Sequence, residues 1–308
     1  MEKHLITIIV VTYNSSTYVL DALNSISSSN YKNLQIIISD DYSTDDTIPK
    51  CQEWINKYSS VYDILLLKAD TNKGTAFNIN KALPYVKGDF VKIIAGDDEF
   101  CDNYFSVFMD YFANNPDCNI LSTNVKYIYE NKGYVSDNKS FTSYIHTNQL
   151  DTIEMYRTII RYNCIFSPTC IIKSTLFHSI GGFDERFPLC EDLFFYAKVL
   201  KNGNRIHFIN ECLIKYRIHD KSVQSRNTNI VFTRYDQDYM LGKKELLWED
   251  MGLCEKRLEK CIYCNYRKIL LNGNDYRLSN RFRISNIALC NFILKVIRFR
   301  YYLNIANH

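Results

Sequence analysis

The sequence predicts an α/β protein in which a mostly parallel sheet is flanked by helices, with a helical extension at its C-terminal end. In the first hundred residues, short runs of Ile, Val and Leu alternate with helical patterns, as in βαβ units. Most of these runs are apolar throughout, which is typical of strands covered by helices on both faces. From Val231 onward the chain has helical spacing with basic and aromatic residues and no strand pattern. We therefore predict an α/β domain over residues 1–228 and a helical, basic extension over residues 229–308.

Four strands with helices between them are predicted in the first hundred residues. The strands cover residues 5–11, 34–39, 63–68 and 90–95. Between these strands, apolar residues recur every three or four positions, which is the spacing of a buried helix face. They are Val19, Leu23 and Ile26, then Ile48, Cys51 and Ile55, then Ala76, Ile79, Leu83 and Val86.

Beyond residue 100 the alternation is less regular. Helical spacing predicts helices over residues 104–112, 152–161 and 192–200. Strands are predicted over residues 120–129, 169–173, 205–209 and 213–218, and a polar loop over residues 130–140.

Composition places the chain among ordinary globular proteins. Its 308 residues are 46% apolar, which is enough for one large core and an appendage. The formal net charge of +3 is the sum of two unlike parts, because residues 256–308 carry eleven Lys or Arg against two acids. Any attraction to an anionic surface therefore belongs to the C-terminal end.

Targeting signals and cysteine usage indicate a cytoplasmic enzyme. The N-terminal residues match a first strand better than a signal peptide. No uncharged apolar stretch reaches about 18 residues, so no membrane-spanning helix is predicted. Eleven cysteines without a secretion signal suggest reduced thiols.

Polar side chains follow three of the predicted strands, where ligands bind in open parallel sheets. The strand ends read Thr12-Tyr13-Asn14-Ser15, Asp40-Asp41-Tyr42-Ser43 and Gly96-Asp97-Asp98-Glu99. Helix caps and turns use the same residue types, and they explain any one of these sites. All three together favour a shared cation, because clustered carboxylates repel one another unless a cation lies between them.

The Gly-Asp-Asp step is the most specific of the three. Mg²⁺ and Mn²⁺ prefer oxygen ligands, and in phosphate sites they take one or two carboxylates together with phosphate oxygens. The pair Asp97 and Asp98 therefore predicts a metal bridge to a diphosphate. The chain has no G-x-x-x-x-G-K-[ST] sequence and no glycine in its first strand-to-helix turn, which argues against P-loop enzymes and dinucleotide dehydrogenases.

A second candidate group lies about a hundred residues further on. Gly181-Gly182-Phe183-Asp184-Glu185 precedes Glu191 and Asp192, which open a predicted helix. Carboxylates at a helix start gain from the helix dipole and from capping, and this explains them locally. The alternative is a general base, which must lie within hydrogen-bond reach of an acceptor hydroxyl.

These motifs occur in a recognisable order. Residues 11–18 (V-T-Y-N-x-x-x-Y), 36–47 (I-I-I-S-D-D-x-S-x-D-x-T) and 72–78 (N-x-G-x-x-x-N) precede the Gly-Asp-Asp step, the Gly-Gly-Phe-Asp-Glu segment, the Glu-Asp pair and Tyr216-Arg217-Ile218-His219. Over roughly residues 5–225 the chain resembles the family 2 inverting glycosyltransferases, in particular those of bacterial surface-polysaccharide synthesis. The resemblance implies a GT-A fold, with nucleotide-sugar binding over about residues 1–100 and the acceptor side over about residues 101–228.

The resemblance also implies a donor site. In such enzymes the turn matching Thr12, Tyr13 and Asn14 packs around the nucleotide, and the acid matching Asp41 holds the edge of the uracil or thymine ring. The first acid of the DxD element, matching Asp97, lies near the ribose and the diphosphate. Uridine is the base that the resemblance favours, with thymidine and guanosine as alternatives.

The metal and the catalytic base follow in the same way. The resemblance implies that Asp98 binds Mn²⁺ or Mg²⁺, that His219 helps to hold the metal or the diphosphate, and that Asp192 is the catalytic base. Two departures from the family pattern are Ala95, where many relatives have a further acid, and Val11, where many have proline. The first leaves fewer carboxylates for the metal.

The implied activity is transfer of a sugar from a nucleotide-diphosphate sugar to a hydroxyl of a glycan or a lipid-linked oligosaccharide, as in a metal-assisted hexosyltransferase of the inverting, single-displacement type. Two alternatives remain open at this stage. One is a sugar nucleotidyltransferase, although the Gly-rich basic loop expected after the first strand is missing. The other is an inactive nucleotide-sugar-binding relative that acts as a scaffold.

The basic C-terminal end has two interpretations. Basic residues flanking an apolar, aromatic helix suit a helix that lies on the anionic inner face of the cell membrane. Packing of that helix on the catalytic domain is the alternative. No nucleic-acid partner is expected, because the segment has no recognised nucleic-acid-binding module.

Overall fold

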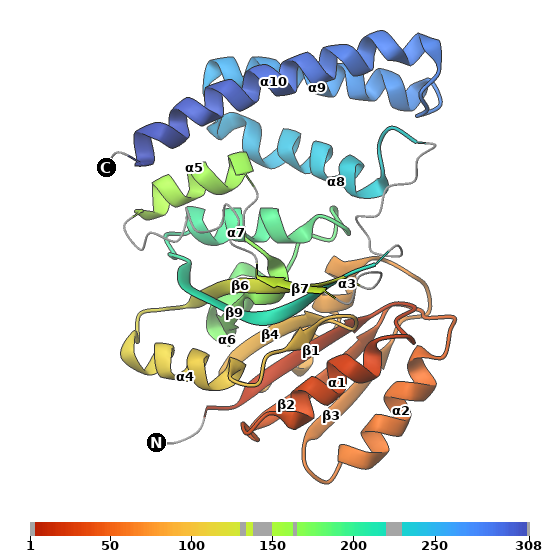
Figure 1. The fold of residues 1–308 in the computed structure, drawn as a ribbon, viewed down its shortest axis with the longest axis vertical. Helices are drawn as coiled ribbons and strands as arrows, with labels where there is room; N and C mark the ends of the chain where they lie inside the picture. Colours follow the sequence, from red (N-terminus) through yellow and green to blue (C-terminus); the bar gives the residue numbers. More distant parts are fainter. Residues whose placement is uncertain (1–3, 130–133, 138–149, 163–164, 220–229, 307–308) are drawn as a thin grey trace. The chain divides into compact units, whose positions relative to one another are not determined.

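The computed structural model describes residues 4–129, 134–137, 150–162, 165–219 and 230–306. The chain divides into two compact units, residues 1–220 and residues 221–308. In Figure 1 the first unit runs from red to green and the second is blue.

The first unit is built around a mixed β-sheet. Its strand order is β3-β2-β1-β4-β8-β6-β9-β5, and β7 pairs with β6 beside this path. The strands are β1 (Ile6–Thr12), β2 (Leu34–Asp40), β3 (Asp63–Lys68), β4 (Phe90–Ala95), β5 (Glu99–Phe100), β6 (Ile120–Tyr129), β7 (Tyr134–Asp137), β8 (Ile171–Lys173) and β9 (His207–Ile218).

The first four strands form the parallel part of the sheet. Strand β1 pairs in parallel with both β2 and β4, so the chain switches sides at β1. Ligand sites of open α/β sheets lie at such switch points, outside the carboxyl ends of the strands. The side chains from Ile6 to Val10 are buried, as the unbroken apolar run predicts.

The rest of the sheet is mostly antiparallel. Strand β8 pairs antiparallel with β4 and β6, and β5 pairs antiparallel with β9, whereas β6 and β9 are parallel. The α/β class is thus confirmed, and the run of neighbouring parallel strands is confined to β3, β2, β1 and β4, with one further parallel pair between β6 and β9. The two strands predicted over residues 205–218 are a single strand, β9, whose pairing with β6 shifts register around Asn124. A bulge there interrupts the apolar alternation that the sequence shows.

Helices connect the strands of the first unit. They are α1 (Val19–Ser28), α2 (Thr47–Tyr58), α3 (Thr75–Asn80), α4 (Tyr104–Asn114), α5 (Thr152–Tyr162), α6 (Ser174–Ile180) and α7 (Glu191–Lys201). Helix α6 and strands β5 and β7 were not predicted, and β7 occupies part of the expected polar loop. These elements are short, so a periodic pattern has too few positions in which to appear.

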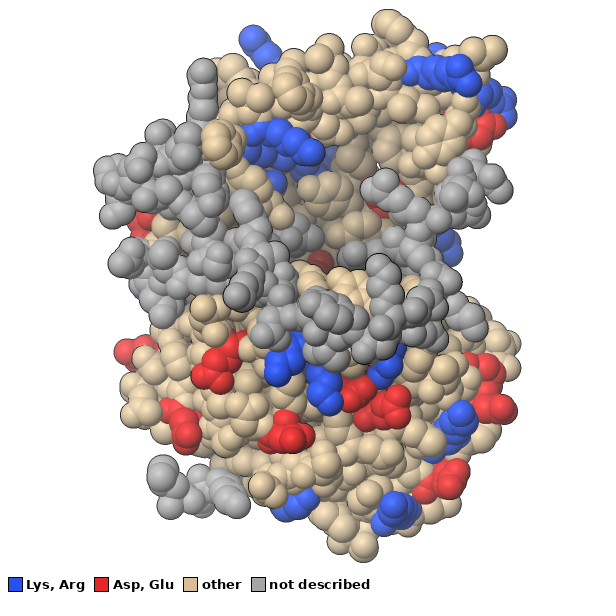
Figure 2. Space-filling view, in the orientation of Figure 1, with Lys and Arg blue, Asp and Glu red and all other residues tan. Residues whose placement is uncertain are grey.

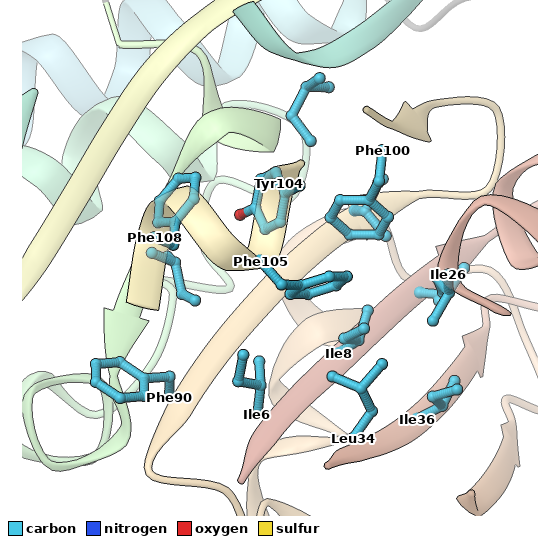
Figure 3. Packing of buried hydrophobic residues seen from close by; sticks show 14 of the residues in the cluster. Ile6, Ile8, Ile26, Leu34, Ile36, Phe90, Phe100, Tyr104, Phe105 and Phe108 are labelled. Atoms are coloured by element: carbon cyan, nitrogen blue, oxygen red, sulfur yellow. The ribbon is translucent and has the colours of Figure 1, made fainter. Parts of the chain in front are cut away.

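An aromatic cluster supports the sheet close to the switch point (Figure 3). Phe100, Tyr104, Phe105 and Phe108 pack together, and the rings of Tyr104 and Phe108 are stacked with centroids 4.4 Å apart. The cluster contacts apolar side chains of β1 and β2 such as Ile8. It gives the turn after β4, which carries the Asp pair, a rigid base.

The second unit is helical, as predicted. It contains α8 (Arg234–Gly242), α9 (Leu253–Leu271) and α10 (Leu278–Ala306), with two short helical turns at Lys243–Leu247 and Trp248–Asp250. Its own core includes Ile262, Ile269 and Leu294.

A buried ionic group ties the helices of the second unit together. Glu259 accepts hydrogen bonds from Lys243 and, at 2.7 Å, from Arg298, while Arg298 also reaches Glu255. Each charge has a partner, which a buried charge requires.

Among the described residues, no helix is long and apolar enough to cross a membrane.

Candidate active site

The turns after β1 and β2 are hydrogen-bonded to each other. Thr12 donates from its hydroxyl to the Asp40 carboxylate at 2.8 Å, and Ser43 donates to the same carboxylate from its backbone and its hydroxyl. The side-chain carbonyl of Asn14 accepts from the Thr44 backbone at 2.8 Å. Thr12 is buried, whereas the side chain of Tyr13 is exposed at this edge. The turn after β1 thus offers a fixed backbone and the exposed aromatic ring of Tyr13.

Backbone strain marks the same edge. Asn14 has a φ of 49° and Tyr42 a φ of 69°, a region that residues other than glycine rarely adopt. Such conformations cost free energy and cluster at functional sites. Here they occur at the two turns that the sequence assigned to nucleotide binding.

Asp41 is buried beneath this edge. Its carboxylate accepts hydrogen bonds from the backbone N–H groups of Lys73 at 3.0 Å and Gly74 at 2.7 Å. The acid therefore fixes the segment that opens α3. Lys81 on the same side donates to the Asp40 backbone carbonyl at 2.8 Å, and burial lowers its pKa against the opposing charges of Asp41 and Asp40. No motif in the sequence marks Lys81.

Helix α3 also contacts the segment that leads to Asp192. Gly74 has a φ of 93°, and a Cβ atom there would lie 2.5 Å from the Cβ of Pro188. The side-chain amide of Asn80 donates to the Phe183 carbonyl at 2.8 Å and accepts from the Phe183 backbone at 2.9 Å. The N-x-G motif and the Gly-Gly-Phe-Asp-Glu motif thus form one contact between the two halves of the unit.

The Asp97–Asp98 turn lies against the turn after β1. A Cβ atom on Gly96 would lie 2.9 Å from the Cγ2 methyl of Thr12, so the close approach requires glycine. Asp98 is buried and accepts a hydrogen bond from the Arg217 backbone at 3.0 Å. Burial, and next the Asp97 carboxylate, raise the pKa of Asp98 well above its usual value.

Residues at the end of β9 and just after it hold Asp97 and Asp98 in place. Arg217 donates to the Asp97 carbonyl at 2.9 Å and to the Glu99 carboxylate at 2.6 Å. An imidazole nitrogen of His219 lies 2.9 Å from the Asp97 carboxylate. The Arg217 guanidinium also lies over the ring of Tyr18, 4.6 Å from its centroid. Arg217 and Tyr18 thus help to hold the candidate site together. In the sequence they are marked only by their places in the motifs at residues 11–18 and 216–219.

Two observations bear on a metal at this turn. Asp97, Asp98 and His219 offer carboxylate oxygens and an imidazole nitrogen, which Mn²⁺ accepts. A divalent cation would offset the burial and the Asp97 repulsion that raise the pKa of Asp98. Within the described residues, no group of three or more His, Cys, Asp or Glu is arranged to enclose a metal. A metal completed by diphosphate oxygens needs only one or two carboxylates, so the residues fit that kind of site.

Asp192 lies in the first turn of α7. The residue before the helix makes no side-chain cap, and the Asp192 carboxylate accepts from the Leu193 backbone at 2.7 Å. Burial raises the pKa of Asp192 to about 6, and the Leu193 hydrogen bond opposes the rise. A carboxylate in that range accepts protons better than an ordinary aspartate and is still ionised near neutral pH.

Tyr216 connects the acids electrostatically. Burial, followed by the charges of Asp98, Asp97 and, more weakly, Asp192, raises the pKa of its hydroxyl. The three carboxylates therefore act on one side chain of β9. Tyr216 also packs edge-to-face with Tyr127, whose ring centroid is 6.1 Å away. Only its place beside Arg217 in the quoted motif could have pointed to it from the sequence.

Solved structures with the same fold are glycosyltransferases. TarS 1–349 from S. aureus, in complex with UDP-GlcNAc, gives a TM-score of 0.61 at 20% identity and covers 85% of this chain and 72% of that chain. The mannosyltransferase PcManGT from Pyrobaculum calidifontis, in complex with GDP-Man and Mn²⁺, gives a TM-score of 0.57 at 16% identity and covers 94% and 74%. The fold is that of the GT-A class of glycosyltransferases.

The chain belongs to glycosyltransferase family 2. The family model described as glycosyl transferase family 2 matches residues 7–172, more than half of the chain. An uncharacterized glycosyltransferase of Haemophilus influenzae is 26% identical over 72% of this chain and 68% of its own length. The Escherichia coli protein WfgD, named as a UDP-Glc:alpha-D-GlcNAc-diphosphoundecaprenol beta-1,3-glucosyltransferase, is 24% identical over 77% and 86%. These matches confirm the predicted family and identify the chain as a glycosyltransferase.

Proposed function

We propose that this enzyme transfers a sugar, with inversion, from a UDP-sugar to a hydroxyl of a glycan or a lipid-linked oligosaccharide. The observation that carries the proposal is the pair Asp97 and Asp98, which lies at the switch point of the sheet and is held there by Arg217 and His219. The raised pKa of Asp192 supports it. UDP-GlcNAc in TarS and the UDP-Glc and lipid-diphosphate substrates in the name of WfgD support this choice of donor and acceptor.

The donor would lie at the β1 and β2 strand ends. Thr12, Tyr13 and Asn14 pack around the nucleotide, and Tyr13 offers the exposed ring on which a base can stack. Asp41 presents its remaining carboxylate lone pairs to the N–H edge of the uracil. Asp97 lies toward the ribose and the diphosphate.

The diphosphate would lie at the Asp97–Asp98 turn. Asp98 and His219 are the residues that would hold Mn²⁺ or Mg²⁺, which when bound supplies positive charge to the departing diphosphate. Mn²⁺ in the complex of PcManGT with GDP-Man supports a metal of this kind. Arg217 keeps the turn in place through the Asp97 carbonyl.

Asp192 would act as the base of a single displacement. Its carboxylate takes the proton of the acceptor hydroxyl while that oxygen bonds to the anomeric carbon. The bond between the anomeric carbon and the diphosphate oxygen breaks on the opposite side, so the configuration inverts. No covalent glycosyl-enzyme forms.

The substitution Asp192→Asn tests this assignment. We expect transfer to fall by ~10²–10⁴-fold, the usual contribution of a general base, while the Kd for UDP, measured by calorimetry, stays unchanged. Asp110→Asn, at an exposed position on α4, is the matched control and should keep full activity. Near-normal turnover of D192N would contradict the assignment of the base.

The cellular setting follows from the acceptor. We place the enzyme in the cytoplasm at the inner face of the cell membrane, where a lipid-linked acceptor would be available. The free state of every described cysteine supports a reducing compartment.

A further inference from the structure

Helix α10 is apolar on two opposite faces. One face carries Ile287, Cys290 and Leu294, which are buried in the core of the second unit. The other carries large apolar side chains that are between 38% and 74% exposed. We call these residues the outer stripe of α10: Phe282, Leu289, Phe292, Ile293, Val296 and Phe299.

The outer stripe is continuous from Leu289 to Phe299, and Phe282 lies two turns earlier on the same side, with Ser285 between. At 100° per residue its six members fall within an arc of about 120°, on the side away from Leu294. A surface helix normally presents polar side chains to solvent on that side. Single exposed apolar residues are ordinary, but a set on one side of a helix that includes three phenylalanines marks an interaction surface.

The charges around the stripe are of one sign. Arg281 and Lys295 are exposed on the same helix, beside the stripe. The two acids among residues 256–308 are already paired, Glu259 with Lys243 and Arg298 in the interior and Asp275 with Arg277. Figure 2 shows blue Lys and Arg side chains on the surface of the helical unit with little red among them.

We propose that the outer stripe of α10 is a docking surface for an anionic lipid bilayer. Pairing of two outer stripes would bring like charges together, which disfavours a symmetric dimer through this surface, whereas anionic headgroups complement Arg281 and Lys295. Helix α10 has 29 residues, and charged side chains along it rule out spanning. It lies in the plane of the interface, with the phenylalanines at the acyl boundary and the basic side chains among the headgroups.

The docking surface is independent of the proposed chemistry. It belongs to the helical unit and uses none of the residues assigned to the donor or the acceptor. An enzyme docked in this way and a lipid-linked acceptor would lie at the same membrane surface.

Vesicle co-sedimentation of the full-length protein tests the proposal. Vesicles of phosphatidylcholine alone and of phosphatidylcholine mixed with phosphatidylglycerol serve as probes. We expect binding to the anionic vesicles that weakens as salt is raised, and at least ~10-fold weaker binding of the triple variant F282Q/F292Q/F299Q. All three positions are exposed, so the variant should unfold at the same temperature as the wild type.

Two controls make the result specific. Leu253→Gln with Leu271→Gln changes two exposed leucines of α9 outside the stripe and should leave vesicle binding unchanged. D192N should bind vesicles like the wild type even when it has lost transfer, so that failure of the proposed function and failure of docking can be told apart. Equal binding of the triple variant, or no preference for anionic vesicles, would overturn the proposal. So would a wild-type dimer that the triple variant converts to a monomer, because the stripe would then be a subunit interface.

Discussion

At the residue scale, the chemistry depends on where single carboxylates lie. Asp192 is held against the helix start by the Leu193 N–H, and burial raises its pKa to about 6. Asp98 is more deeply buried, and burial together with the Asp97 carboxylate raises its pKa well above the usual value. These different environments suit Asp192 to its proposed role as a base near neutral pH and Asp98 to its proposed role as a ligand of a cation.

The pKa of Asp192 predicts the pH dependence of transfer. Below about pH 6 the carboxylate is protonated and cannot accept a proton from the acceptor, so kcat/KM should fall about tenfold per pH unit. Initial rates between pH 5 and pH 8 measure this. A rate independent of pH across that range would argue against Asp192.

The same shift predicts an effect on stability. The folded pKa of about 6 is above the usual aspartate pKa of 3.8, so Asp192 binds more protons in the folded state than in the unfolded state between these values. The free energy of unfolding therefore falls as pH rises from about 4 to 6. We expect D192N to be more stable than the wild type at pH 7.5 by about 1–2 kcal/mol in urea unfolding, because the penalty for the buried charge is removed. A marked loss of stability would instead indicate a structural carboxylate.

Lys92 is a second residue whose environment matters. It is fully buried on β4 and donates to the backbone carbonyls of Pro168 and Cys170, and burial lowers its pKa to about 7. The substitution Lys92→Met leaves both carbonyls without this donor, which should cost ~1–3 kcal/mol in urea unfolding. Exposed Lys57→Met on α2 serves as the control. Equal stability of the two variants would mean that the buried amine stabilises nothing.

At the element scale, α3 connects the proposed donor side with the proposed acceptor side. Its first turn is fixed by Asp41 through Gly74, and its end is fixed to Phe183 by Asn80. The contact between Gly74 and Pro188 leads directly toward α7. A change in α3 should therefore affect binding of the donor and the position of Asp192 together.

Alanine substitutions at two glycines with positive φ differ in what the added methyl group would contact. Gly74→Ala adds a methyl group 2.5 Å from the Cβ of Pro188, whereas Gly203→Ala, at a φ of 79°, meets no atom within 4 Å. At a φ of 93° and a ψ of 171°, Gly74 has a backbone conformation that is almost restricted to glycine, so G74A adds backbone strain to the contact with Pro188. G74A should therefore lose ~1–3 kcal/mol more than G203A, together with most of the transfer activity. Equal effects of the two substitutions on unfolding and on activity would contradict the role given to α3.

The sequence predicted the elements that have their own periodicity. Strands β2, β3 and β4 begin at the expected residues because each is an apolar run bounded by polar residues. Strand β5 was missed because two residues carry no period, and it exists only through pairing with β9, more than a hundred residues away. The bulged pairing of β9 with β6 is set by tertiary contacts in the same way.

The site was predictable to the same extent. Strand-end acids could be found because strand ends can be read from the sequence, and the structure places Asp41, Asp97 and Asp98 at adjoining turns. Tyr216, Arg217 and Lys92 act through partners distant in the chain. The sequence marks the first two only as letters of the Tyr-Arg-Ile-His motif and does not mark Lys92. Their roles become visible only when β9 and β4 are brought to the same edge of the sheet.

At the scale of the whole molecule, a catalytic unit with a large core precedes a helical unit with its own core. A ligand that binds only the folded catalytic unit should raise its free energy of unfolding by mass action, by about 2.7 kcal/mol at a hundred times the Kd, and its unfolding temperature rises with it. We expect UDP with Mn²⁺ to stabilise the protein and a chelator to remove most of the gain. D98N should lose the dependence on Mn²⁺, whereas D192N should keep it. Stabilisation by UDP that is unaffected by the chelator would contradict a metal at Asp98.

The stereochemistry of donor hydrolysis tests the central claim most directly. With water as the acceptor, ¹H NMR of the first sugar released from an α-linked UDP-sugar reports the configuration before mutarotation. A single displacement at the Asp192 site predicts that the β-anomer forms first. First appearance of the α-anomer would contradict an inverting mechanism and the role of Asp192 as its base.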